Sequence, residues 1–108
     1  MGEASGEQPL RELAEIDRLV HEPARLMILM VLYTLESADF RFLVNATELT
    51  DGNLSSHLAK LEQAGYILAD KGYAGKKPRT LLSLTETGRK AVDAYRTLMG
   101  QALLQLGK

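Results

Sequence analysis

The sequence predicts a mainly helical fold with a single β-hairpin, and three patterns in its 108 residues support this prediction. Leucines recur at helical spacing at positions 54, 58 and 61, inside the segment 51–65. A basic segment with two glycines and a proline, KGYAGKKPR, separates two short apolar runs, as in a β-hairpin. Residues 23–36 are apolar over more than half of a helical surface, which is typical of a central core helix.

A polar tail and one further helix are expected ahead of the core helix. Residues 1–8, MGEASGEQ, are small and polar, so we expect a disordered tail in front of one domain that spans 9–108. Pro9 suits the start of a helix that runs over 9–20. This helix is expected to end near His21, because Pro23 disfavours helical geometry at the residue before it and suits the first turn of the next helix.

The segment after the core helix fits two periodicities. In residues 40–49, FRFLVNATEL, the side chains of Phe40, Phe42 and Val44 alternate as they do in a strand. The same segment also places Phe40, Leu43 and Val44 at helical spacing. A brief extended entry followed by a short helix reconciles the two patterns.

Residues 51–65 are predicted to form a helix with one apolar and one polar face. Thr50 is a suitable N-cap for it, and Gly65 is a suitable C-cap. With the leucines pointing inward and about 100° between residues, Ser56 and Lys60 point most nearly outward. Short polar side chains near a helix start can bond base edges or phosphates of DNA, although an ordinary solvated face is the alternative.

The hairpin and one last helix complete the predicted elements. Residues 66–84 are expected to form the hairpin, and its loop is expected between Gly72 and Pro78. Thr85 can cap a final helix over 85–106. No internal repeat or low-complexity segment interrupts this order.

The net charge of −1 hides an uneven distribution along the chain. Residues 1–23 carry six acids against two arginines, whereas residues 51–80 carry five bases against three acids. The hairpin segment holds four cations and two glycines around one proline, which makes a poor core and a good phosphate contact. Local patches matter more for phosphate binding than the total charge, although a solvated hairpin tip is the alternative.

A helix that fits the major groove, followed by a cationic hairpin or wing, is the arrangement by which a winged helix-turn-helix holds duplex DNA. Base contacts are expected mainly from Asn53, Ser56 and Lys60 in the 51–65 recognition helix, and phosphate contacts from the helix start and the 66–84 wing. The candidate DNA-binding residues are Thr50, Gly52, Asn53, Ser55, Ser56, His57, Lys60, Lys71, Lys76, Lys77 and Arg79. His57 lies about 60–70° from the leucine face, so it can reach a phosphate or cover the core edge.

These residues also carry a resemblance to a known family. The run TDGNLSSHLAKLEQAGYI, with Lys71, KPRT at 77–80 and LTETG at 84–88, closely resembles the small winged-helix transcriptional regulators of the MarR and ArsR type over about 23–98. The resemblance implies a homodimer whose 51–65 helices enter successive major grooves, with wing tips along the backbone or minor groove. Two features depart from the pattern: the cysteine clusters of the metal-sensing branch are absent, and Asp51 adds negative charge at the start of the recognition helix.

The two end helices are expected to form the dimer interface. Apolar residues of the last helix alternate spacings of three and four, as in a coiled-coil seam of two heptads. We expect the compact core to be complete by Leu84, and a chain this short gains stability from association. The expected dimerisation residues are Leu13, Ile16, Val92, Tyr95, Met99, Ala102 and Leu106.

Several other functions are disfavoured. Adjacent helix residues point about 100° apart, so Ser56 and His57 do not suggest a catalytic pair, and no enzyme is expected. With two histidines and no cysteine, we expect no metal site and no cofactor. No apolar run is long enough for a membrane helix, which indicates a cytoplasmic protein. The rival function is a winged-helix protein–protein interaction module that does not bind DNA. The operator, the regulated genes, the direction of regulation and any small-molecule effector are not determined by the sequence.

Overall fold

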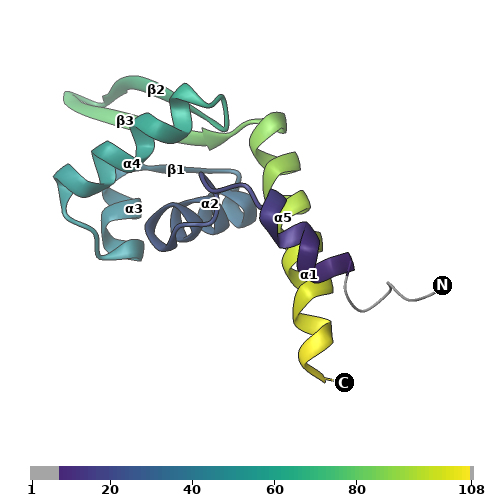
Figure 1. The fold of residues 1–108 in the computed structure, drawn as a ribbon. Coiled ribbons are helices and arrows are strands. Elements are labelled where there is room, and N and C mark those ends of the chain that lie inside the picture. Colours follow the sequence, from purple (N-terminus) through teal and green to yellow (C-terminus); the bar gives the residue numbers. More distant parts are fainter. Residues whose placement is uncertain (1–7, 108) are drawn as a thin grey trace.

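The computed structural model describes residues 8–107, and its elements follow one another as the sequence pattern predicts (Figure 1). Two antiparallel strands form the wing, and a third short strand pairs with one of them in the order β1-β3-β2. The elements are α1 (Gln8–Glu12), the 3-10 turn η1 (Leu13–Glu15), α2 (Pro23–Leu35), β1 (Ser37–Asp39), α3 (Phe40–Thr47), α4 (Asp51–Gln63), β2 (Ile67–Ala74), β3 (Lys77–Leu84), α5 (Glu86–Leu104) and the 3-10 turn η2 (Gln105–Gly107). The predicted mainly helical winged fold is confirmed.

The N-terminal helix is shorter than predicted. Of the tail predicted over 1–8, residues 1–7 lie outside the described part of the chain, and Gln8 already begins α1. The predicted helix over 9–20 is wrong beyond η1, because the backbone becomes extended at Ile16, with ψ 141°. The side chain of Asp17 then accepts hydrogen bonds from the backbone N–H groups of Leu19 at 2.9 Å and Val20 at 3.3 Å. This local turn competes with helical bonding and carries Val20 fully into the core.

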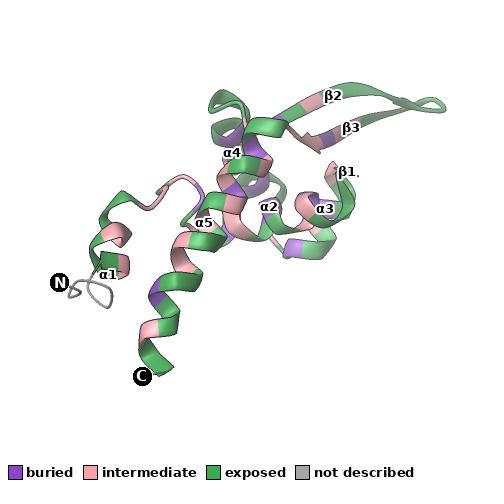
Figure 2. Cartoon of the chain, turned by 90° about the vertical axis from the view of Figure 1, so that its right-hand side faces the viewer, coloured by how far each residue is buried: buried purple, intermediate pink, exposed green. Residues whose placement is uncertain are grey.

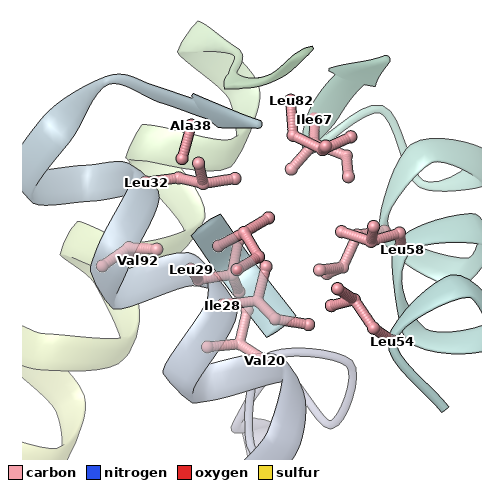
Figure 3. Packing of buried hydrophobic residues seen from close by; sticks show 12 residues of the cluster. Val20, Ile28, Leu29, Leu32, Ala38, Leu54, Leu58, Ile67, Leu82 and Val92 are labelled. Carbon is pink, nitrogen blue, oxygen red and sulfur yellow. The ribbon is translucent and has the colours of Figure 1, made fainter. Parts of the chain in front are cut away.

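The core forms where α2 meets α4 and the base of the sheet. Ile28, Leu29 and Leu32 of α2 are fully buried, which confirms α2 as the central helix. The leucines of α4 point back at them, and Ile67 and Leu82 close the top of the cluster (Figure 3). Burying one such side chain contributes about 1.5–3 kcal/mol relative to leaving it exposed. This packing fixes which face of α4 remains at the surface.

The hairpin covers the predicted residues, but its strands are longer and its turn is shorter than predicted. β2 and β3 pair continuously from Ile67–Leu84 to Ala74–Lys77, so only Gly75 and Lys76 form the turn. Gly75 has φ +67°, which glycine adopts without strain at the first central position of such a turn. The predicted loop from Gly72 to Pro78 is therefore wrong. Pro78 lies opposite Tyr73, one pair beyond the turn, where the alternating ladder leaves a non-hydrogen-bonded position that does not require an N–H group.

α5 is capped by Thr85, as predicted, and its first turn packs closely against the start of the wing. The Thr85 hydroxyl accepts a hydrogen bond from the backbone N–H of Gly88 at 2.9 Å. The rest of the helix runs away from the winged domain, with α1 packed beside it (Figure 1). No helix within residues 8–107 is long and apolar enough to cross a membrane.

We expect Gly88→Ala to destabilise the fold by about 1–3 kcal/mol, as overpacked sites typically do. A Cβ at this position would lie 2.1 Å from the carbonyl oxygen of Tyr66 and 2.8 Å from the Cδ1 atom of Leu84. Urea denaturation measures the effect. Gly52→Ala is the control, because Gly52 is also helical and its Cβ would meet nothing within 4 Å, and it should leave stability unchanged or raise it by up to about 1 kcal/mol. Equal stability of the two variants would contradict the prediction.

Candidate nucleic-acid interface

The outward face of α4 is polar and accessible. Leu54, Leu58 and Leu61 are buried, and the side chains between them face solvent except for that of His57. The exposed candidates on this helix are Gly52, Asn53, Ser55, Ser56 and Lys60. A Cβ built at Gly52 meets nothing within 4 Å, so the helix start is open to a large partner.

Thr50 has a structural role at the start of α4. Its Oγ1 atom accepts a hydrogen bond from the backbone N–H of Asn53 at 3.1 Å, which confirms the predicted N-cap. This bond uses one acceptor site, and the hydroxyl proton remains available as a donor. Thr50 thus fixes the first turn of the helix at an exposed position.

The outer part of the wing is exposed (Figure 2), and its four cations are exposed with it, but they do not all lie on one face. Lys76 lies in the turn, whereas the other three are on strands, where successive side chains point to opposite faces. The register therefore places Lys71 on one face of the hairpin and Lys77 and Arg79 on the other. Arg79 also makes an ion pair with Asp39 of β1, at 3.4 Å. The wing presents cations on both of its faces.

The negative charge of Asp51 is compensated by a residue that the sequence did not single out. Arg41, in the first turn of α3, binds the Asp51 carboxylate through both nitrogens of its guanidinium fork, at 3.1 and 3.4 Å. Both side chains are 62% exposed. No spacing in the sequence indicates this pair, because the contact depends on how α3 packs against α4.

His57 lies on the side of α4 that faces α2. Its Nδ1 atom is 3.1 Å from the Arg25 guanidinium and 4.0 Å from the Glu22 carboxylate. A guanidinium can only donate, so Nδ1 accepts in this contact, and the neutral form of the ring then carries its proton on Nε2. The side chain is only 20% exposed, which places it at the core edge. Its Nε2 proton remains the group that could reach a phosphate.

Glu22 and Asp17 tie the segment before α2 to the winged domain. The backbone N–H of Arg25 bonds the Glu22 carboxylate at 2.8 Å and lowers its pKa, with the charges of His57 and Arg25 acting in the same direction and burial opposing them. The Tyr66 hydroxyl donates to Asp17 at 2.5 Å. Burial, and then the Asp17 carboxylate, raise the pKa of Tyr66 to about 12.

The predicted dimerisation stripe does not form one free face. Val92 is buried in the core of its own chain and Ala102 is also buried, because α5 packs on α2 and α1 packs on α5. His21 lies in the bend before α2, and its Nδ1 atom is 2.9 Å from the hydroxyl of Tyr95. Val92 and Ala102 therefore offer little surface to a second chain, and the prediction that they form an intermolecular seam is wrong. Leu13 and Ile16 are half-buried.

Other apolar side chains remain at the surface of this arm. An apolar groove of 430 Å³ runs between α2 and α5, and its lining includes Met30, Tyr33, Met99 and Leu103. Leu103, Leu104 and Leu106 are 54%, 69% and 81% exposed. Of the predicted dimerisation residues, Val92, Tyr95 and Met99 line this groove, and Leu106 is exposed beyond its end. The part of the chain from Gln8 to Gly107 contains no cluster of three His, Asp or Glu side chains that could hold a metal ion.

Comparisons with known proteins agree with this architecture. The winged helix DNA-binding domain family matches residues 24–103. An uncharacterized protein of Methanocaldococcus jannaschii is 36% identical over 78 residues, which are 72% of this chain and 85% of that protein. The structure of a transcriptional regulator homologue from Pyrococcus horikoshii has a TM-score of 0.84 and 30% identity, covering 89% of this chain and 97% of that chain.

A more distant structure shows the same fold. A MarR family transcriptional regulator from Silicibacter pomeroyi has a TM-score of 0.60 and 17% identity, covering 94% of this chain and 63% of that one. The protein therefore belongs to the family of winged helix DNA-binding domains. The predicted winged-helix, DNA-binding regulator is confirmed at this level, and the comparisons do not support the rival protein–protein module.

Proposed function

We propose that the protein is a homodimeric transcriptional regulator that reads double-stranded DNA with α4 in the major groove and the wing on the adjacent backbone or minor groove. The main observation that supports this proposal is the exposed polar face of α4 together with an exposed cationic hairpin. In this arrangement Asn53, Ser56 and Lys60 contact base edges, and the wing cations contact phosphates. The protein acts by binding rather than by catalysis.

Dimerisation through the α1–α5 arm is part of this proposal. α5 extends beyond the winged domain and carries exposed leucines at its end, next to the apolar groove between α2 and α5. A second copy that covers this surface would place two α4 helices on one duplex. Half-sites one helical turn apart, about 34–36 Å, then fit a protein with two-fold symmetry.

A selection of bound genomic fragments at two salt concentrations tests the function. We expect an inverted repeat to be recovered, and recovery should become more selective at the higher salt, where non-specific phosphate binding weakens. Recovery of fragments without a common sequence would argue against sequence-specific reading. A common sequence without inverted symmetry would argue only against the symmetric dimer, and sequence-specific reading would stand.

The residues that read bases are tested by repeating the selection with Ser56→Ala and Lys60→Ala. Each variant should change the preference among sites, since one good base contact discriminates by about 1–3 kcal/mol. Lys90→Ala is the control, because Lys90 is also exposed but lies on α5. If each variant weakens all sites by the same factor, Ser56 and Lys60 only position the helix.

A further inference from the structure

Arg41 lies between the two elements that hold DNA in a winged helix. On one side it contacts Asp51, the first residue of α4. On the other it lines a groove of 520 Å³ together with Lys77, Arg79 and Thr80 of β3. The start of α3 therefore bridges the space between the recognition helix and the wing.

This groove combines cations from two elements. Arg41 comes from α3, whereas Lys77 and Arg79 project from the same face of β3. Two acids accompany them, since Asp51 binds Arg41 and Asp39 binds Arg79. Both ion pairs are partly or largely exposed, and such pairs contribute little to stability in water. The arginines can therefore exchange a carboxylate for another anion that offers two oxygens to the guanidinium, at small cost.

The path of DNA across the domain supplies that anion. With α4 in the major groove and the wing on the neighbouring backbone or minor groove, one phosphate strand has to pass between the two elements. We propose that Arg41 binds a phosphate of this strand through its guanidinium fork, and that Asp51 holds Arg41 in place in the free protein. The proposal rests on the placement of α4 and the wing described above.

Asp51 then has a definite effect on binding. In the free protein it competes with phosphate for Arg41, and in the complex its carboxylate lies near a polyanion. Both effects weaken DNA binding. Removing Asp51 should strengthen binding, and removing Arg41 should weaken it whether or not Asp51 is present. If Arg41 only neutralised Asp51, its removal would have no effect on DNA binding once Asp51 is absent.

The test is a double-mutant cycle with Arg41→Ala, Asp51→Ala and the double variant. Binding to one duplex is titrated over a series of salt concentrations. Arg41→Ala should lower the logarithmic salt slope by about 0.9 in both backgrounds, which corresponds to about eightfold weaker binding near 0.1 M salt. Asp51→Ala alone should bind more tightly than the wild type. Circular dichroism melting confirms that each variant is folded.

Lys90→Ala is the control. Lys90 is also an exposed cation, but it lies on α5 and does not line the groove between α2 and α5. Its substitution should leave the slope unchanged. The proposal is overturned if Arg41→Ala has no effect in the Asp51→Ala background, or if Lys90→Ala has the same effect as Arg41→Ala. If the wild type itself shows no salt-dependent binding, the proposed placement of α4 and the wing on DNA is wrong, and the proposal for Arg41 is wrong with it.

Discussion

Replacing Lys76, Lys77 and Arg79 together by alanine should lower the affinity for every DNA sequence by a similar factor. The three cations are exposed on the wing, two on one strand face and one in the turn. Each phosphate contact that is lost reduces the logarithmic salt slope by about 0.9, so three contacts would reduce it by about 2.7. The corresponding loss of affinity near 0.1 M salt is about 500-fold. Titrations of one specific and one unrelated duplex at several salt concentrations measure both quantities.

A control with the same change in net charge separates local contact from the overall field of the protein. Arg11, Arg18 and Lys90 are exposed on α1, on the linker after η1 and on α5, away from the wing and outside the groove between α2 and α5. Their joint replacement by alanine should change the slope little. An equal loss of slope in both triple variants would mean that the wing makes no particular contact. Stability should hardly change, because surface substitutions are usually within about 0.5 kcal/mol.

Leu103→Glu should convert the proposed dimer into a folded monomer. Leu103 lines the groove between α2 and α5 and is 54% exposed, so the substitution does not disturb the core of one chain. In a symmetric dimer it would place two uncompensated carboxylates in the interface, and a buried unpaired charge costs about 3–5 kcal/mol. The dimer should therefore dissociate at least about a hundredfold more readily. Sedimentation at micromolar concentration measures this change.

Two further variants make the dimer experiment specific. Met99→Glu changes a second lining residue and should have the same effect, whereas Thr97→Glu adds the same charge at an exposed position that does not line the groove. The monomeric variants should keep weak binding to one half-site and lose the tight binding that requires two. A monomeric wild type, or a dimer that persists in both Leu103→Glu and Met99→Glu, would place the interface elsewhere.

Local signals predicted most of the elements correctly. Pro23 and Thr85 mark the starts of α2 and α5, and Thr50 marks the start of α4, because capping depends on residues within three positions of one another. The first helix was overestimated for a related reason. Its apolar spacing continues to Val20, but the side chain of Asp17 satisfies the backbone there and ends the helical pattern.

The stripe on α5 shows where periodicity is insufficient. Val92, Met99 and Ala102 share a spacing, yet Val92 packs on the core, Met99 lines an open groove and Ala102 is buried. A repeat of three and four residues shows that a helix has an apolar face, but it does not show which neighbour covers that face. The same limit applies to His57, because the sequence does not show whether it faces DNA or the core edge. Its contacts with Arg25 and Glu22 place it at the core edge.

The sequence alone determined the order of the elements, the polar face of α4 and the cations of the wing, because each depends on spacing along a short segment. Only the tertiary structure decided how those charges are distributed. Arg41 and Asp51 are ten residues apart, and Asp39 and Arg79 are forty apart, so both pairs exist only because α3 packs beside α4 and β1 beside β3. Side-chain charges act through space, whereas the pattern of a sequence reports neighbours along the chain.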